Sequence, residues 1–320
     1  MPSVRAPAWL CLLALAPACG GEPDTAGVVA GPGSLPAEEP VTCAPGELQQ
    51  QDGSCRPAGI APDGCAAGFV SDQASGCYAV LPDDACDEGR MAVPGEAACR
   101  EVAPCGDSPF GAAPAEDGTE HVDAAYAGGD SDGSAAKPWT TIQQGIKAAA
   151  PGAVVAIAAG RYDENVIISG KAVVLWGRCP ELVEIAGSAS GTAAVFVKKS
   201  ASGTEIRDLA VTGPKFGVGV SGSEGVVLDR VWIHDTGKRG LALENTLGST
   251  GVTLRRSLVE AASDIAVMAY GATISIEESV VRDTRPGSGQ GRGVVARLGS
   301  TLSIRASAIE RHSLSTICPP

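Results

Sequence analysis

The C-terminal half of the chain contains one short apolar pattern five times, at intervals of 22, 26, 22 and 28 residues. The anchor positions of the five units are Ile206, Leu228, Leu254, Ile276 and Ile304. A unit of this length is too small to bury its own apolar side chains, so successive units must stack on one another. The repeat therefore predicts a solenoid.

Each unit has the pattern of short strands separated by corners. Apolar side chains alternate around the anchor, and the parity of the alternation changes across the next two residues, which indicates a strand, a corner and a second strand. A third strand-like stretch follows most corners after Gly or Asp. Four of the corners carry a charged residue that we expect to face solvent: Asp208, Arg230, Arg256 and Glu278. Three short strands per turn predict an all-β domain, a right-handed parallel β-helix, over residues 120–320.

Charge provides an independent check on this register. Neighbouring rungs of a parallel stack lie roughly 4.8 Å apart, so opposite charges in adjacent rungs attract each other. The position after the anchor alternates in sign through Arg207, Asp229, Arg255, Glu277 and Arg305. The sixth position after the anchor alternates through His234, Glu260, Arg282 and Glu310. A third column, formed by Ser257, Ser279 and Ser307, can form hydrogen bonds along the stack.

A short helix is predicted immediately before the stack. Thr140-Thr141-Ile142-Gln143 offers a capping box, Trp139 is placed for a hydrophobic staple, and the apolar stripe ends at Pro151-Gly152. We expect this helix to cover the first rung, since the end of a stack exposes apolar side chains and unpaired backbone groups. At the other end, the last rung lies close to Cys318, and an uncapped edge there would offer a surface for association.

Three segments before the repeats resemble the beginning of bacterial pectin-lyase-like right-handed β-helix proteins, including a group described as a domain of unknown function. The segments are Asp130-Ser-Asp-Gly-Ser134, Lys137-Pro138-Trp139-Thr-Thr141-Ile142-Gln143 and Gly160-Arg-Tyr162-Asp-Glu164-Asn-Val166. The resemblance covers about two hundred residues and implies the β-helix fold and, in some relatives, activity on carbohydrates. Such solenoids often carry an asparagine ladder at a corner. This chain departs from that pattern, because Asn165 and Asn245 are its only asparagines and neither lies in the charged corner column.

The N-terminus has the pattern of an export signal. Residues 1–18 combine Arg5, an apolar core and a small-residue cleavage site, which is typical of a signal peptide. Because Cys19 and two glycines follow, the segment is similar to a bacterial lipoprotein signal with Cys19 as the lipidated residue. We expect an outer-membrane or cell-surface lipoprotein of a Gram-negative bacterium, held to the membrane only by this anchor; the alternative is plain secretion. Residues 19–42 are expected to form a flexible acidic tether.

Residues 43–105 have the pattern of a disulfide-stapled stalk, followed by a linker over residues 106–119. A Cys-x-x-Gly start recurs three times, with a second cysteine 12, 12 and 13 residues later. This spacing predicts three local disulfides, with other connectivities left open. The pairs are Cys43–Cys55, Cys65–Cys77 and Cys86–Cys99. We also predict that Cys105 pairs with Cys179 and that Cys318 is unpaired. Metal binding by the stalk is disfavoured, because paired Cys-x-x-Cys spacings are absent.

Charge is distributed unevenly along the chain. The overall net charge is −13, and residues 20–136, with 21 acidic and three basic residues, carry an excess of −18. From Lys137 onward, 20 basic residues face 16 acidic ones, a net charge of +4. An acidic stalk disfavours nucleic acid as a partner, whereas a mildly basic solenoid favours anionic glycans weakly.

Charged residues on the solenoid are the candidates for chemistry. Lytic relatives cleave uronic polysaccharides with calcium-binding acidic groups and an Arg or Lys base, and hydrolytic relatives use clustered aspartates. The candidate catalytic residues here are Asp235, Arg239, Asp283, Arg282 and His234. Asp235 and Asp283 lie two rungs apart, about 10 Å, which is too far for one calcium ion. The competing interpretation is that these charges only form the ladders.

The sequence as a whole favours a noncatalytic surface protein that displays a β-helix for glycan recognition or envelope structure, with a cell-surface or extracellular polysaccharide as partner. No cofactor and no metal site are expected. The alternative is a polysaccharide lyase, which would use calcium, or a glycoside hydrolase of the pectin-lyase-like type.

Overall fold

The computed structural model describes residues 42–57, 60, 63–73, 76–114, 116–287 and 291–312. The chain divides into two units, residues 1–42 and 43–320. The predicted signal peptide, Cys19, nearly all of the tether and Cys318 lie outside the described residues. None of the described helices has the length and apolar character needed to cross a bilayer.

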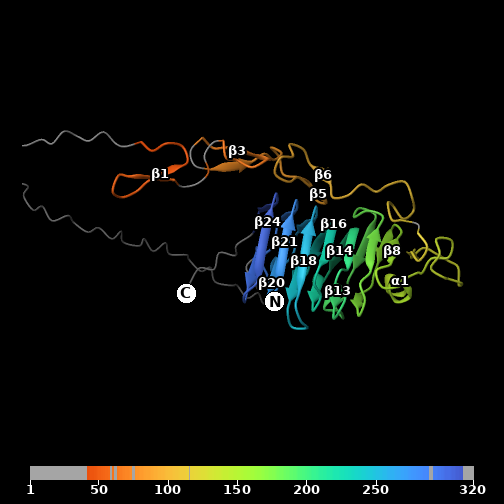
Figure 1. The fold of residues 1–320 in the computed structure, drawn as a ribbon. Coiled ribbons are helices and arrows are strands. Elements are labelled where there is room, and N and C mark those ends of the chain that lie inside the picture. Colours follow the sequence, from red (N-terminus) through yellow and green to blue (C-terminus); the bar gives the residue numbers. More distant parts are fainter. Residues whose placement is uncertain are drawn as a thin grey trace, which may run out of the picture. The chain divides into compact units, whose positions relative to one another are not determined.

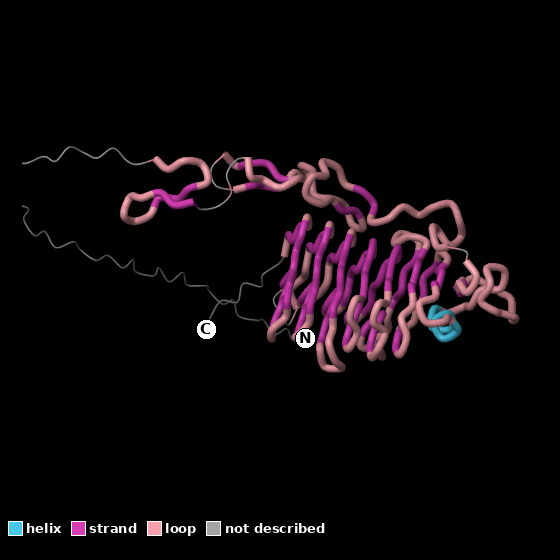
Figure 2. The backbone as a smooth tube through the Cα atoms, in the orientation of Figure 1, coloured by secondary structure: helices cyan, strands magenta, loops and turns pink. Residues whose placement is uncertain are grey.

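Residues 120–310 form a right-handed parallel β-helix of about six turns, as the repeat predicts (Figure 1). One sheet contains β7 (Glu120–Val122), β8 (Val154–Ile157), β9 (Gly160–Tyr162), β11 (Val174–Gly177), β12 (Val183–Ala186), β14 (Glu205–Gly213), β16 (Val226–Thr236), β18 (Gly251–Arg255), β19 (Leu258–Glu260), β21 (Thr273–Glu277), β22 (Val280–Arg282), β24 (Thr301–Arg305) and β25 (Ala308–Glu310). The other sheet contains β10 (Val166–Ser169), β13 (Ala193–Lys198), β15 (Phe216–Ser221), β17 (Arg239–Glu244), β20 (Ile265–Tyr270) and β23 (Arg292–Arg297). Figure 2 shows the strands stacked rung upon rung.

The predicted register is confirmed. Leu228 pairs with Ile206 on one side and with Leu254 on the other, and Ile276 pairs with Leu254 and Ile304. The first four anchors are fully buried in one continuous apolar core. The serine column also forms as predicted: the backbone amides of Val231, Ser257 and Ser279 each donate to the hydroxyl of the serine one rung further along.

The corner after each anchor is a residue in the left-handed backbone region. Asp208, Arg230, Arg256 and Glu278 have φ between 47° and 54°. This conformation is uncommon for residues other than glycine, and it produces the sharp change of strand direction. The expectation that all four side chains face solvent is wrong for Asp208, which is buried because both of its carboxylate oxygens accept hydrogen bonds from Arg230.

The helix α1 (Ile142–Ala148) covers the first rung, as predicted (Figure 1). Its N-cap is Thr141, and the capping box is completed by Gln144, one residue later than the Thr140–Gln143 spacing expected from the sequence. Gln143 is used differently, since its side chain both donates to and accepts from the backbone of Ile167 at the edge of β10. The shift therefore allows one glutamine to cap the helix and the next to satisfy a strand edge.

The last described rung is exposed. Every residue of β24 is exposed, including Leu302 at 37% and Ile304 at 44%. Residues 313–320 lie outside the described part of the chain.

The stalk is built from three antiparallel hairpins, each closed by one disulfide. The hairpins are β1 (Glu47–Gln49) with β2 (Cys55–Pro57), β3 (Phe69–Ser71) with β4 (Cys77–Ala79), and β5 (Arg90–Met91) with β6 (Arg100–Glu101). The disulfides join Cys43 to Cys55, Cys65 to Cys77, Cys86 to Cys99 and Cys105 to Cys179, in agreement with the predicted pairing. The glycine of each Cys-x-x-Gly start has φ between 74° and 86°, a turn conformation that a residue with a Cβ adopts poorly.

Candidate functional site

The site lies on one outward surface of the β-helix, here called the second face. Its side chains come from the strand after the left-handed corner: an apolar column of Ala210, Trp232, Leu258, Val280 and Ala308, and beside it the charged column from His234 to Glu310. Leu258 and Val280 point away from the solenoid core, yet they are 0% and 1% exposed. Another part of the protein must therefore cover them.

The cover is the third hairpin of the stalk (residues 86–103). Met91, Val93 and Val102 pack against Leu258 and Val280 in a small apolar cluster that is separate from the solenoid core. The hairpin buries apolar surface that the β-helix would otherwise expose, which stabilises the contact.

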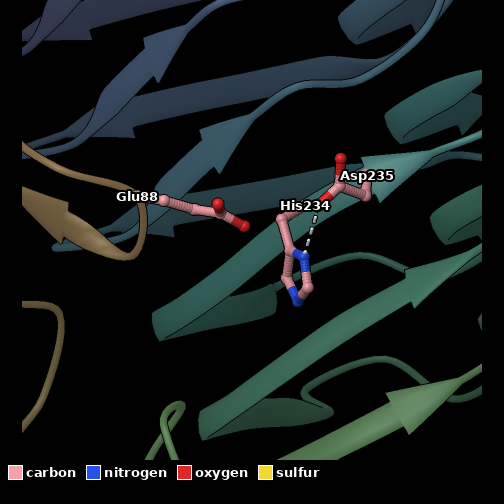
Figure 3. A group of neighbouring side chains, drawn as sticks. All are labelled: Glu88, His234 and Asp235. Carbon is pink, nitrogen blue, oxygen red and sulfur yellow. Dashed lines mark hydrogen bonds and ion pairs between the residues drawn. The ribbon is translucent and has the colours of Figure 1, made fainter.

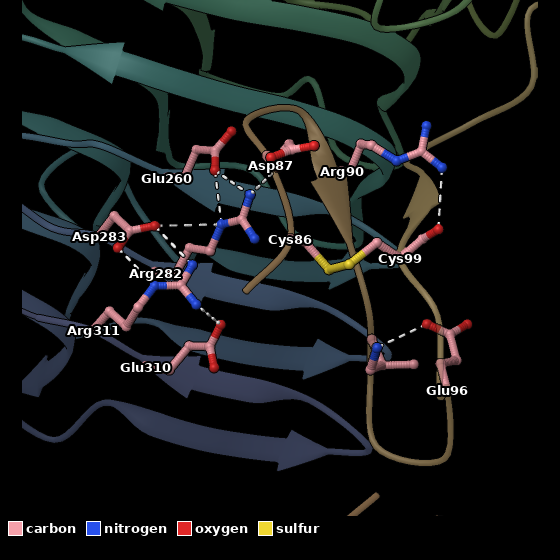
Figure 4. The surroundings of a disulfide bond; sticks show 11 residues. Cys86, Asp87, Arg90, Glu96, Cys99, Glu260, Arg282, Asp283, Glu310 and Arg311 are labelled. Carbon is pink, nitrogen blue, oxygen red and sulfur yellow. Dashed lines mark hydrogen bonds and ion pairs between the residues drawn. A yellow bond between two sulfur atoms is a disulfide. The ribbon is translucent and has the colours of Figure 1, made fainter. Parts of the chain in front are cut away.

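Glu260 and Arg282 lie beneath this hairpin and hold it by hydrogen bonds (Figure 4). Arg282 Nε donates to Glu260 at 2.7 Å, and its Nη2 donates to the backbone oxygen of Asp87 at 2.8 Å. The other carboxylate oxygen of Glu260 accepts from the Gly89 amide and from Trp232 Nε1, each at 2.8 Å. A Cβ on Gly89 would lie 3.3 Å from the Trp232 ring, so glycine allows the close approach. Arg282, a candidate catalytic residue from the sequence, is thus a 2%-exposed interface residue.

A cleft remains beside the covered patch, and Trp232 forms its centre. A hollow of about 260 Å³ lies between the third hairpin and the solenoid, and a second of about 360 Å³ lies along the solenoid surface. Trp232, Pro180 and Glu181 line both hollows, which together are called the Trp232 cleft. The remaining lining residues that carry charge are Glu88, Arg90, Glu101, Arg161 and Glu184. Four carboxylates against two guanidinium groups make the cleft acidic.

The indole of Trp232 is held in one orientation. Its Nε1 donates to Glu260, and its ring stacks on the His234 imidazole with centroids 3.9 Å apart and an interplanar angle of 20°. Such a fixed, partly exposed aromatic ring provides a contact surface at little conformational cost.

His234 is surrounded by carboxylates (Figure 3). Its Nδ1 lies 3.2 Å from Asp235 Oδ2 and its Nε2 lies 3.3 Å from Glu184 Oε1, while its side chain is only 10% exposed. Glu88, from the third hairpin, completes a group in which one ligand atom of each of Glu88, His234 and Asp235 lies within 4.8 Å of the others.

The remaining candidates are held in ion pairs, and two of them, Arg282 and Asp283, lie 3.5 Å apart. Asp235 pairs with Arg285 at 2.9 Å, and Asp283 accepts two hydrogen bonds of 2.9 Å from Arg311. The Arg311 hydrogen bonds hold the pKa of Asp283 below its ordinary value, against the opposing effect of burial. Arg239 lies on β17, 3.5 Å from Glu244 and stacked over Phe216. The structure brings His234 together with Asp235 and Arg282 together with Asp283, but these two pairs do not face each other as an acid and a base of one site.

On the second face carboxylates surround His234, whereas on the first face, the outward surface before the corner, arginines surround a carboxylate. There Asp229 is fully buried by the side chains of four arginines that lie 2.5–3.6 Å away: Arg207, Arg230, Arg255 and Arg256. Burial alone would raise the pKa of Asp229, but the Arg256 hydrogen bond and the charges of Arg230, Arg256 and Arg255 together hold that pKa below its ordinary value. Arg207 also stacks over Trp176, with its guanidinium carbon 4.2 Å from the ring centroid.

Several residues of the site were not singled out from the sequence. Glu88 lies in the stalk, 146 residues before His234, and Arg161 and Glu184 lie in the irregular first coils. One available signal was the apolar column itself, because an outward position that carries Trp, Leu and Val in successive rungs indicates a surface buried on both sides.

Comparison with known proteins identifies the family. Residues 126–289, just over half of the chain, match the family described as "Protein of unknown function (DUF1565)". The chain belongs to this family. The DUF1565 region includes Trp232, His234 and Arg282, whereas Glu88 and the rest of the third hairpin lie before it. No curated protein matches the chain.

Solved β-helix structures show a distant likeness. A pectin methylesterase in complex with a hexasaccharide is 15% identical, with a TM-score of 0.45 over 59% of this chain and 65% of its own. The pectin methylesterase from carrot is 18% identical, with a TM-score of 0.43 over 58% of this chain and 63% of its own. The catalytic domain of a GH87 alpha-1,3-glucanase in complex with tetrasaccharides is 13% identical, with a TM-score of 0.40 over 66% of this chain and 41% of its own. The chain thus spans less than two thirds of the length of each.

Proposed function

We propose that this DUF1565 protein recognises a glycan at the Trp232 cleft without altering it chemically. The supporting observation is the fixed, partly exposed indole that lines two adjoining hollows. A pyranose ring has an apolar face of C–H groups that stacks on an aromatic ring, and hydroxyl groups at its rim that need polar partners. Trp232 supplies the first kind of contact, and the surrounding carboxylates and guanidinium groups supply the second.

The charge of the cleft defines the class of glycan. Glu88, Glu101, Glu181 and Glu184 outnumber Arg90 and Arg161, and the Arg161 guanidinium is itself paired with Glu184. Uronic acids would bring further carboxylates into this acidic cleft and would be repelled. The ligand we propose is therefore a neutral or amino-sugar polysaccharide, in contrast to the anionic preference expected from the net charge of the solenoid.

The contacts of the candidate residues support the noncatalytic part of the proposal. A lyase or hydrolase needs an acid or base free to exchange a proton with the substrate. Asp235 and Asp283 are each paired with an arginine, and Glu260 and Arg282 are buried beneath the third hairpin. The competing hypothesis, a calcium-assisted lyase or a glycoside hydrolase, requires that one of these pairs opens when substrate binds.

The cellular setting is part of the proposal. Export through residues 1–18 and lipidation of Cys19 would place the β-helix at the outer membrane or cell surface of a Gram-negative bacterium, beyond a tether and a disulfide-stapled stalk. The four disulfides are consistent with an oxidising compartment. Labelled-lipid incorporation into the full chain, lost in Cys19→Ala, tests the anchor; incorporation that survives the substitution would exclude it.

A glycan array followed by titration of the best ligand tests recognition. Trp232→Ala is expected to lower affinity at least tenfold, since it removes the central aromatic contact. Trp176→Ala, on the first face, is the matched control and is expected to bind as the wild type does. The same samples are assayed for reducing ends and for unsaturated product on neutral and uronic polymers with calcium. Product that the wild type forms and that Asp235→Ala or Arg239→Ala does not form would show that the protein is an enzyme and would contradict the noncatalytic proposal.

A further inference from the structure

The surroundings of His234 contain an unbalanced set of hydrogen-bond acceptors. Carboxylate oxygens of Glu184 and Asp235 lie 3.3 and 3.2 Å from its two ring nitrogens. The neutral imidazole has only one N–H, so one of its nitrogens would point a lone pair at a carboxylate. The side chain is 10% exposed, and its buried Nε2 has no hydrogen-bond partner of good geometry among the described residues. The imidazole is nearly buried, whereas the side chains of Glu184 and Asp235 are 25% and 40% exposed; a ring lone pair aimed at either carboxylate is repelled unless a cation lies between them.

The arrangement of the two nitrogens indicates which side needs the cation. Nε2 lies 3.3 Å from Glu184, whereas Nδ1 faces Asp235, with Glu88 as a neighbour (Figure 3). The contact between Nε2 and Glu184 lacks hydrogen-bond geometry, so a small rotation of the Glu184 side chain would let Nε2 donate to it. Nδ1 would then direct its lone pair toward Asp235. A histidine that binds a metal commonly has this form, with its second N–H donated to a carboxylate that fixes the tautomer.

We propose that Glu88, Asp235 and Nδ1 of His234 bind one divalent transition-metal ion of the zinc class, and that Glu184 is the positioning residue behind the histidine. One imidazole nitrogen and two carboxylates are a donor set that suits zinc, whereas calcium takes oxygen ligands almost exclusively. His234 Nδ1 and Asp235 Oδ2 are already 3.2 Å apart, and the Glu88 ligand atom lies within 4.8 Å of its partners. The exposed Glu88 side chain can rotate to the roughly 3.4 Å spacing of a tetrahedral site.

Such an ion would connect two parts of the chain. Glu88 belongs to the third hairpin, and His234 and Asp235 both belong to β16. Arg285, which pairs with the other oxygen of Asp235, stays outside the ligand set and limits the charge of the site. The ion would fasten the hairpin over the second face at the edge of the Trp232 cleft, independently of whether the cleft binds a glycan.

The test is a zinc titration of the full chain, purified without a histidine tag, with free thiols blocked by iodoacetamide and metal first removed by a chelator. Wild-type protein is expected to bind one zinc ion per chain, with an affinity that calcium does not match. His234→Ala and Glu88→Gln are each expected to weaken binding at least tenfold, and Glu184→Gln by 10- to 100-fold. His312→Ala, a histidine on the last rung, is the control and is expected to bind zinc like the wild type.

Thermal unfolding provides a second readout that does not depend on the titration. Zinc is expected to raise the melting temperature of the wild type and of His312→Ala but not that of Glu88→Gln, whose substituted side chain is exposed and leaves the fold intact. Zinc affinity unchanged in both Glu88→Gln and His234→Ala, or calcium bound more tightly than zinc, would overturn the proposal. So would the absence of saturable zinc binding by the wild-type protein. None of these measurements involves a glycan, so their failure leaves the function of the cleft to its own test.

Discussion

The two outward faces of the β-helix carry the same kind of charge ladder but use it differently. On the first face, Arg255 keeps a side-chain exposure of 38%, and the arginines around Asp229 form the surface of the protein. On the second face, the side chain of Arg282 is only 2% exposed, because the third hairpin lies over it. Alternating charge therefore fixes the register of the stack on both faces, but it does not determine whether a face is open or covered.

The neighbouring column makes the difference. On the second face, the charged column runs beside Trp232, Leu258 and Val280, and the hairpin contributes Met91, Val93 and Val102 to the same apolar cluster. On the first face, the corresponding neighbours in the later rungs are Thr253, Ser275 and Ser303, which are compatible with water. An apolar column next to a charge ladder thus recruits a covering element, and the ladder becomes part of an interface.

The largest effect is expected from Glu260→Ala. This substitution removes the carboxylate that is hydrogen-bonded to buried Arg282 and the acceptor of the Gly89 amide, and it leaves Arg282 only the more distant Asp283 carboxylate at 3.5 Å. We therefore expect a loss of about 3–5 kcal/mol in the free energy of unfolding. The matched variant on the open face is Glu277→Ala, which is expected to cost less than about 1 kcal/mol. Urea unfolding of both proteins measures the difference, and equal losses would mean that the two ladders do not differ in burial.

The hairpin contact is tested by Met91→Ala. Met91 is fully buried between the hairpin and the second face, so its truncation is expected to cost about 2–4 kcal/mol. Leu48, in the first hairpin, is 54% exposed, and Leu48→Ala is expected to change stability by less than about 0.5 kcal/mol. If limited proteolysis released the third hairpin no faster in Met91→Ala than in Leu48→Ala, the packing described here would be incorrect.

Asp229 distinguishes the first face by its response to pH. Asp229→Asn is expected to cost about 1.5–3 kcal/mol at neutral pH, because it weakens charged hydrogen bonds from Arg256 and Arg207. Since the pKa of Asp229 is lowered in the folded protein, its contribution is fully present above the unfolded value of about 3.9 and is lost as the pH falls through the folded value. The difference between wild type and variant should therefore be constant between pH 8 and roughly 5 and shrink in more acidic buffer. A difference that grows on acidification would contradict this sign.

The smallest effect is expected for the two tryptophans. Trp232→Phe loses the hydrogen bond from Nε1 to Glu260 and is expected to cost about 1 kcal/mol more than Trp176→Phe, because Trp176 Nε1 has no hydrogen-bond partner in the described part of the chain. Chemical unfolding of the two variants gives the comparison, because both replace an indole by the same smaller ring. Identical losses would show that the Glu260 bond does not hold the indole.

The sequence predicted what depends on neighbouring rungs. The anchors, the ladders and the serine column follow from a repeat in which every contact is made with the next unit, so a regular interval defines the pairing. The local disulfides follow from their 12- and 13-residue spacing in the same way. The capping box was displaced by one residue, because Gln143 and Gln144 suit the same role and only the strand edge at Ile167 decides between them.

The parts that were not predicted depend on contacts far apart in the sequence. The charge pattern of Glu260 and Arg282 resembles that of the open ladder, and only the docked hairpin makes them interface residues. Asp208 was expected in solvent, since nothing local indicates that Arg230 in the next rung would enclose it. Glu88 reaches His234 across 146 residues of sequence, and the Cys-x-x-Gly spacing of its hairpin gives no indication of where that hairpin docks.

Hydrogen exchange of the third hairpin bears on all of these conclusions at once. In the full chain, the amides of residues 89–103 are expected to exchange far more slowly than those of the first hairpin at residues 43–57, because the third hairpin is docked on the second face and the Gly89 amide donates to buried Glu260. Leu258→Asp, which places a charge in the apolar contact, should raise their exchange to the rate of the first hairpin. Fast exchange in the wild-type protein, or rates that Leu258→Asp leaves unchanged, would mean that the second face is open and that the Trp232 cleft does not form.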